Sequence, residues 1–155
     1  MTKQANQEDN KQHSKQQMKQ ESRHEMLLKG ARIVIIEDDN ESRESLLMAL
    51  EEQGATVAPA CDAEDGVEVV LRESPEIVIC DIGLPGMDGY YLIQRLRDHE
   101  QSHGLKPAVA IALTGRTDEV DRLRSVGEGF QHFISKPTDP YVVIDKIVTA
   151  LDAQR

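Results

Sequence analysis

Residues 77–89 read Ile-Val-Ile-Cys-Asp-Ile-Gly-Leu-Pro-Gly-Met-Asp-Gly, a run of apolar β-formers that ends at Asp81 and leads into a loop rich in chain-breaking residues. A strand that is apolar throughout is typical of a parallel sheet covered on both faces. The carboxyl ends of such strands are where α/β proteins place their ligands and their chemistry. Asp81 is therefore the best candidate in this chain for a reactive carboxylate.

Three other apolar runs are also followed by polar residues, whose side chains are of the kinds that bind metal ions or phosphate. Because parallel strands present their carboxyl ends at one edge of the sheet, we expect these side chains to gather around Asp81. They are Glu37 and Asp38 after residues 32–36, Thr114 after residues 108–113, and Lys136 after residues 130–134 and a serine.

Strand and helix patterns alternate five times from Ala31 onward, and the poorest strand, residues 56–58, precedes Pro59 and belongs at an edge. Five such units with short connections predict an α/β fold: a flavodoxin-like, doubly wound, five-stranded parallel sheet with strand order 2-1-3-4-5 and helices on both faces. Apolar residues at helical spacing place the helices at residues 41–53, 62–72, 88–97, 117–126 and from 140 onward.

The order of acid pair, single acid, hydroxyl and lysine resembles the receiver domain of bacterial response regulators. The resemblance covers Ala31 to Leu151 and includes the motif Asp-x-x-Leu-Pro-Gly-x-Asp-Gly and the dipeptide Lys136-Pro137. It implies a phosphorylation-dependent signalling switch in which Asp81 is the nucleophile that becomes phosphorylated. Such a protein catalyses its own phosphorylation and dephosphorylation and is otherwise not an enzyme.

A metal site is expected at the same place. Three neighbouring carboxylates repel one another by roughly 4 kcal/mol per pair at an effective dielectric of 20, so a cation should sit among them. Hard oxygen ligands suit Mg²⁺. The resemblance implies Asp38 and Asp81 as side-chain ligands, the backbone carbonyl of Gly83 as another, and Glu37 through water. Without Asp81, a helix amino-terminal cap would be the favoured interpretation of Glu37 and Asp38, and the presence of Asp81 reverses this preference.

The resemblance also assigns roles around the phosphoryl group. Lys136, preceding a cis bond to Pro137, and Thr114 would hold phosphoryl oxygens, and Thr114 would move toward them on phosphorylation. Phe133 would then turn inward as the second switch residue, although an ordinary strand aromatic is the alternative. Access to the phosphoryl group would be set by Gly115, which should widen the approach, and by Arg116 at the rim.

A sensor histidine kinase or a histidine phosphotransfer protein is the expected phosphodonor. Because the chain stops about four residues after the last predicted helix, we expect a stand-alone regulator that signals by contact. Its downstream protein partner would bind the surface formed by the fourth helix, the fifth strand and the start of the fifth helix.

Three alternatives remain. Residues 81–97 and 112–115 look like receivers of hybrid histidine kinases, which favours a phosphorelay intermediate. A constitutive interaction module would be indicated by loss of Asp81, Lys136 or an acid of the pair, and all are present. An aspartate phosphatase would need a second acid at Gly83.

Composition limits the other possibilities. A net charge of -10 and 3% aromatic residues argue against direct nucleic-acid binding, and no apolar stretch approaches the ~20 residues of a membrane span. We expect a cytoplasmic protein in which Cys61 and Cys80 stay reduced. Residues 1–29 hold six glutamines and a net charge of +2, which predicts a disordered or partly helical extension, with the receiver domain at residues 30–155.

Overall fold

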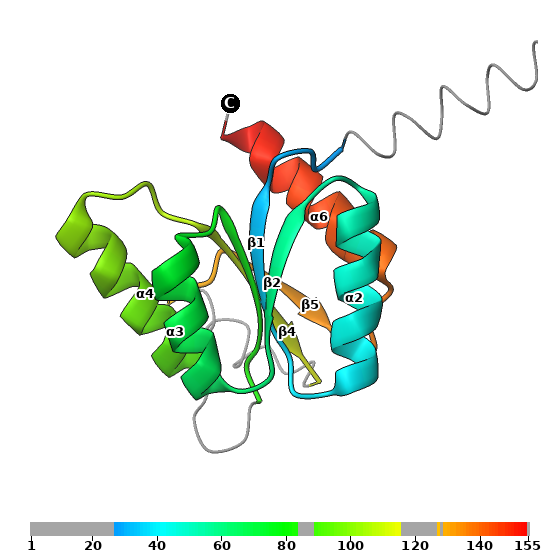
Figure 1. The fold of residues 1–155 in the computed structure, drawn as a ribbon, viewed down its shortest axis with the longest axis horizontal. Helices are drawn as coiled ribbons and strands as arrows, with labels where there is room; N and C mark the ends of the chain where they lie inside the picture. Colours follow the sequence, from blue (N-terminus) through cyan, green and yellow to red (C-terminus); the bar gives the residue numbers. More distant parts are fainter. Residues whose placement is uncertain (1–26, 84–88, 116–126, 128, 155) are drawn as a thin grey trace, which may run out of the picture.

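The computed structural model describes residues 27–83, 89–115, 127 and 129–154. Its strands form one parallel sheet in the order β2-β1-β3-β4-β5 (Figure 1). This order confirms the predicted fold class and places the poorest strand at an edge, as expected. The strands are β1 (Arg32–Ile36), β2 (Thr56–Ala60), β3 (Ile77–Asp81), β4 (Val109–Thr114) and β5 (His132–Ser135).

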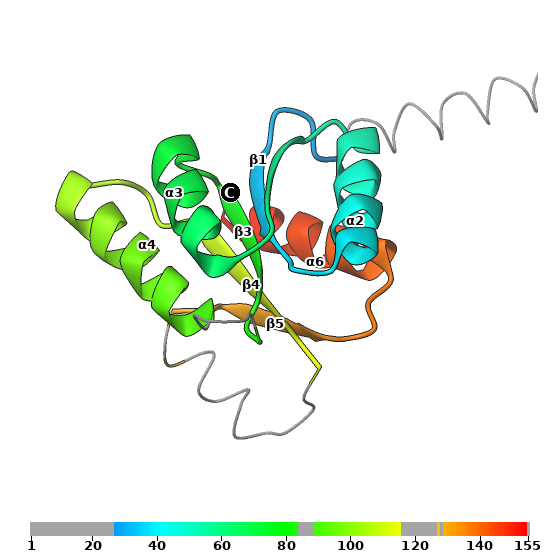
Figure 2. The ribbon, with the colours of Figure 1, turned by 60° about the horizontal axis from the view of Figure 1, so that its bottom comes forward.

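The described helices cover the two faces of the sheet in pairs. α2 and α6 lie together on one face, and α3 and α4 lie on the other, as Figures 1 and 2 show from two directions. None of them combines the length and the apolar character that a membrane-spanning helix requires. Their bounds are α2 (Asn40–Glu52), α3 (Ala63–Glu73), α4 (Gly89–His103) and α6 (Pro140–Ala153).

Each face of the sheet contributes its own apolar core. Alternate residues of the central strands point to opposite faces, so Ile77 and Ile79 pack toward α2 and α6, whereas Val78 and Cys80 pack toward α3 and α4. All four side chains are fully buried. The central strands are therefore held from both sides, which leaves their carboxyl ends as a rigid platform.

Local signals explain where several helices begin and end. The Asp139 carboxylate accepts a hydrogen bond from Tyr141 N at the start of α6, with Pro140 in the first turn. After α2, Gly54 has φ +93°, a backbone conformation that favours glycine at the end of a helix.

The predicted end of the third helix, at Arg97, was wrong, because α4 continues to His103. The added turns are polar, and tertiary contacts stabilise them. Arg97 forms an ion pair with Glu100 at 2.6 Å and donates to the Gly129 carbonyl, which precedes β5. Glu100 in turn accepts the Ala108 N–H, next to β4.

Two other sequence boundaries also differ from the structure. Leu28, placed by the sequence in the polar extension, is 1% exposed and packs in the core, and its N–H donates to the Gln53 carbonyl at 3.0 Å. Phe130, expected to begin the fifth strand, lies two positions before β5. It is a core residue and packs edge-on against Tyr90. Residues 1–26, Arg116 and the helix expected at residues 117–126 lie outside the described residues.

Candidate functional site

The carboxyl ends of β1 and β3 bring three acids together. Glu37 follows β1, Asp81 is the last residue of β3, and Ile36 pairs with Cys80 across the two strands. Carboxylate oxygens of Glu37, Asp38 and Asp81 all lie within 4.8 Å of one another. Glu37 is 1% exposed and Asp81 7%, whereas Asp38 is exposed to solvent. The expected acid cluster is thus present at the expected edge of the sheet.

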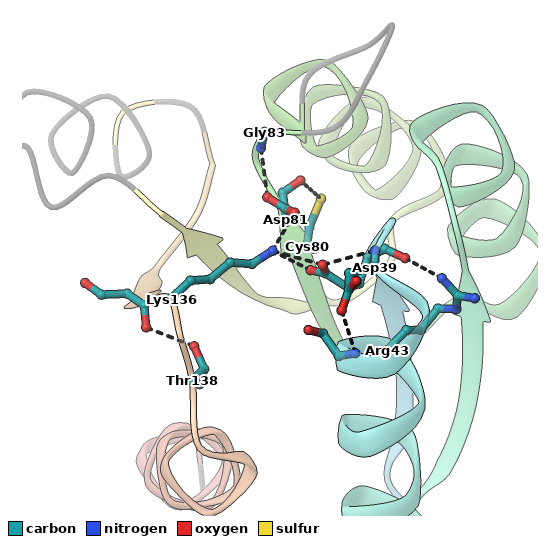
Figure 3. A network of polar contacts seen from close by, with 10 residues as sticks. Asp39, Arg43, Cys80, Asp81, Gly83, Lys136 and Thr138 are labelled. Carbon is teal, nitrogen blue, oxygen red and sulfur yellow. Dashed lines mark hydrogen bonds and ion pairs between the residues drawn. The ribbon is translucent and has the colours of Figure 1, made fainter.

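Lys136 extends from the end of β5 across the sheet edge toward Asp81 (Figure 3). Its ammonium nitrogen lies 2.6 Å from Asp81 Oδ2 and 2.9 Å from Glu37 Oε1, and donates a hydrogen bond to each. Its backbone N–H donates to the Thr114 carbonyl at 2.7 Å, and the bond to Pro137 is cis, as the resemblance implied. Lys136 therefore contacts both buried acids from the opposite side of the site.

Both oxygens of Asp81 are held in place. The Gly83 N–H donates to Oδ1 at 2.9 Å, and Lys136 donates to Oδ2. The Cys80 thiol donates to the backbone carbonyl of Asp81 at 3.3 Å (Figure 3). The carboxylate at the end of β3 is consequently fixed in orientation before any ligand arrives.

Burial and charge act in opposite directions on the ionisation of this site. Burial raises the pKa of Glu37, the nearby Asp81 charge raises it further, and the hydrogen bond from Lys136 offsets only part of the rise. Burial lowers the pKa of Lys136, but hydrogen bonds to Asp81 and Glu37 outweigh it, so the net shift is upward. The ammonium ion is thus held charged beside the acids.

The turn between β1 and α2 shows that Glu37 and Asp38 do not cap the helix. Asp39 is the amino-terminal cap, because its carboxylate accepts the Ser42 N–H at 2.9 Å. Arg43 donates from one nitrogen to the Glu37 carbonyl at 2.8 Å and from another to Asn40 Oδ1 at 2.6 Å. The acid pair is left to face Asp81.

Asp39 and Arg43 were not singled out from the sequence. Asp39 is an acid at a position suited to cap the helix amino terminus, three residues before Ser42. Because Glu37 and Asp38 directly precede it, the sequence did not show which of the three acids is the cap. No sequence signal pointed to the role of Arg43, because its acceptor is a backbone carbonyl that becomes available only through the shape of the turn.

The remaining predicted residues surround the acids. Thr114 ends β4 and is 4% exposed, and its neighbour Gly115 is exposed, with no other described residue within 4 Å of the place where a side chain would begin. Phe133, on β5, is half-buried and packs against the core on the α3 and α4 side. A Cβ at Gly83 would lie 3.6 Å from Asp81 Oδ1, an ordinary contact. Arg116 lies outside the described residues.

The donor set fits a hard divalent cation. One ammonium, that of Lys136, stands against the three carboxylates of the cluster, so negative charge remains in excess. Lys136 lies 2.8 Å from Glu37 Oε2 and 2.6 Å from Asp81 Oδ2. Carboxylate oxygens of three residues within 4.8 Å of one another suit an oxygen-seeking ion such as Mg²⁺.

Residues 33–148 match the family model of the response regulator receiver domain. The chain belongs to this family. Receiver domains are phospho-acceptor switches of two-component signalling systems, and the receiver here carries a cluster of acids where such domains typically bind Mg²⁺.

Curated relatives include both a small protein and larger transcriptional regulators. The receiver is 36% identical over 112 residues to an uncharacterized 14.6 kDa protein of Leptolyngbya boryana, covering 72% of this chain and 83% of that one. It is 31% identical over 119 residues to the transcriptional regulatory protein AfsQ1 of Streptomyces coelicolor, covering 77% of this chain and 50% of that one. The receiver thus spans about half the length of this regulator.

Solved structures agree on the fold. The receiver domain protein of Methanospirillum hungatei superposes with a TM-score of 0.70 at 28% identity, covering 80% of this chain and 95% of that one. The receiver domain of Ssk1 from Saccharomyces cerevisiae, solved with the histidine phosphotransfer protein Ypd1, gives a TM-score of 0.72 at 20% identity, covering 77% and 88%.

Proposed function

We propose that this receiver accepts a phosphoryl group from a phosphohistidine donor onto Asp81 and signals by contact with a downstream protein. The observation that carries the proposal is the fixed orientation of Asp81, whose two oxygens bind the Gly83 N–H and the Lys136 ammonium. A carboxylate oriented in this way is ready to attack an incoming phosphorus atom.

In the proposed reaction an oxygen of Asp81 forms a bond to phosphorus as the bond from phosphorus to the donor imidazole breaks. The imidazole leaves with its electron pair and takes a proton. Lys136 exchanges its hydrogen bond to Asp81 for one to a phosphoryl oxygen, and Thr114 binds another. Glu37, Asp38, Asp81 and the Gly83 carbonyl would hold Mg²⁺, which neutralises charge on the phosphoryl oxygens when bound.

A histidine kinase or a histidine phosphotransfer protein is the proposed donor, and the partner of Ssk1 in its solved complex is a protein of the second kind. For output we propose β5 and the start of α6, together with residues 117–126, which lie outside the described residues. Tyr141 and Val142 of α6 are 66% and 51% exposed, so apolar surface is available there. We also propose a cytoplasmic location, where thiols such as those of Cys61 and Cys80 stay reduced.

A phosphorelay intermediate is the second candidate. Gly115 favours it, because a residue without a side chain leaves a second histidine more room to reach the phosphoryl group. A relay would pass the group on, whereas a terminal regulator would keep it until water removes it.

The test is transfer from a radiolabelled histidine phosphotransfer protein. Label should reach the wild type and the control Asp98→Asn, which changes an exposed acid of α4, but not Asp81→Asn. An unlabelled second phosphotransfer protein, added afterwards, should leave the label in place for a terminal regulator and remove it for a relay. If the receiver stays unlabelled while a known receiver is labelled, and acetyl phosphate also fails to modify it, the constitutive interaction module becomes the favoured function.

A further inference from the structure

Two histidines lie together in the last two turns of α4, away from the acid cluster. His99 and His103 are four positions apart, so their side chains project from the same face of the helix. Their ring centroids are 4.2 Å apart, and the ring planes are inclined by 38°. The third helix predicted from the sequence ended at Arg97, before either histidine.

The hydrogen bond of one ring determines which of its nitrogens is available. His103 Nδ1 lies 2.9 Å from the His99 backbone carbonyl. A carbonyl oxygen only accepts, so Nδ1 must carry the proton, and the lone pair of the neutral ring is then on Nε2. A histidine that binds metal through one nitrogen usually donates from the other to a carbonyl or a carboxylate. His103 already has this arrangement.

The end of α4 is held in place and favours positive charge. Leu105 N donates to the Glu100 carbonyl at 2.9 Å and Gly104 N to the Gln101 carbonyl at 3.4 Å, with Gly104 at φ +60°. These bonds form the Schellman arrangement that closes a helix. The carbonyl groups gathered at a helix carboxyl end attract cations. A metal ion bound here would therefore add favourable charge to a fixed turn.

The surroundings of His99 are mixed in charge. His99 is half-buried and lines a cavity of about 230 Å³ whose other charged groups are Arg32, Glu76, Glu100 and Lys106. Arg32 and Lys106 oppose a metal ion, and Glu76 and Glu100 are already paired with Arg32 and Arg97. The overall charge of -10 favours a cation.

We propose that His99 and His103 form a chelating site for a late first-row divalent transition metal, with Cu²⁺ bound most tightly. Imidazole nitrogens prefer these ions, whereas the acid cluster at the other end of α4 offers only oxygen ligands. Among the described residues no third histidine, cysteine or acid forms a metal-ligand group with this pair, so water completes the coordination. The ion joins successive turns of α4 next to the contact between Glu100 and Ala108 that leads into β4.

The site can be located by NMR on the intact chain. Substoichiometric Cu²⁺, added in the presence of saturating Mg²⁺, should broaden amide signals of residues around 96–106. His103→Gln and His99→Asn should each abolish this local broadening and weaken local Cu²⁺ binding by at least about tenfold. His132→Gln is the matched control, because it removes a histidine from β5, and it should leave the broadening unchanged.

The metal must be located residue by residue, because His13 and His24 also offer imidazoles to it. Broadening that persists around residues 96–106 in both His99→Asn and His103→Gln would overturn the proposal. So would wild-type spectra in which only other regions respond. Acceptance of a phosphoryl group by Asp81 should be the same in His103→Gln as in wild type, so this site and the proposed function are tested separately.

Discussion

The Lys136 ammonium lies 2.6 Å from a carboxylate oxygen of Asp81, although 55 residues separate them in the sequence. Lys136 also contacts Glu37 at 2.9 Å, so a single cation joins the ends of β1, β3 and β5. A contact that joins three strands at a buried acid cluster links the stability of the fold to the chemistry of its site.

Replacing Lys136 should reduce both the stability of the fold and the rate of phosphorylation. Lys136→Met leaves Glu37 and Asp81 facing each other without a cation. We expect a loss of about 2 kcal/mol in unfolding free energy, below the ~3–5 kcal/mol of a fully buried pair because the Lys136 side chain is 29% exposed. Phosphorylation by acetyl phosphate should slow by about 100-fold. Urea unfolding and intact-mass time courses measure the two effects, and Lys146→Met on α6 is the control. Equal behaviour of the two variants would show that the Lys136 contacts contribute nothing.

How much of this site the sequence predicts depends on the kind of contact. The strand ends were predictable, because uninterrupted apolar runs specify buried parallel strands, and polar residues directly after them must meet at one edge. The pairing of Lys136 with Asp81 was expected, but its second contact, with Glu37, was not. That contact depends on how far a long side chain reaches across the sheet, which no local pattern encodes.

The end of α4 was missed for a related reason. Residues 98–103 are polar and give no apolar periodicity, so the pattern stops at Arg97. Arg97 instead donates to the carbonyl of Gly129, which is distant in the sequence. Glu100 accepts the N–H of Ala108, which lies outside the helix. Tertiary hydrogen bonds stabilise these turns, and the pairing of His99 with His103 became visible only with them.

Protonation of His132 should make stability depend on pH. Burial, with a smaller contribution from Lys146, lowers the pKa of His132 below its ordinary value of 6.5. The folded protein therefore binds fewer protons at this site than the unfolded chain does. Its contribution to stability is complete above about pH 6.5 and is lost as the pH falls through the folded pKa. Urea unfolding between pH 5 and 8 should show wild-type stability falling more steeply on acidification than that of His132→Gln. Parallel curves would contradict the shift.

Gly89 should tolerate no side chain, even though it begins a helix. A Cβ there would lie 2.9 Å from the Asp81 carbonyl oxygen and 3.0 Å from Cys80 Sγ. Alanine normally stabilises a helix relative to glycine, but overpacking against backbone should dominate and cost about 1–3 kcal/mol. Gly115→Ala, at an exposed position where a Cβ would meet no other described residue within 4 Å, should change stability by less than about 0.5 kcal/mol. Thermal or urea unfolding compares them, and a Gly89→Ala protein as stable as wild type would refute the packing.

Thr114 and Phe133 should respond together to a phosphoryl group. Beryllofluoride with Mg²⁺ mimics that group on Asp81, so Thr114 should move toward it and the half-buried Phe133 should become more buried. A ligand shifts such an equilibrium only through contacts that differ between the two states, and the Thr114 hydroxyl supplies one. NMR spectra of Thr114→Ala should therefore show beryllofluoride binding with a reduced response at Phe133. An equal response would exclude Thr114 from the coupling, and no wild-type response at Phe133 would favour a relay without a switch.

Intact-mass analysis after incubation with acetyl phosphate shows whether Asp81 is the phosphoryl acceptor. With Mg²⁺, the wild type and the Asp98→Asn control should each gain the mass of one phosphoryl group. Asp81→Asn should gain none, and the wild type should gain none when Mg²⁺ is removed by a chelator. An unmodified wild type, under conditions that label a known receiver, would show that Asp81 does not accept a phosphoryl group. An Asp81→Asn protein that is labelled as fully as the wild type would show the same.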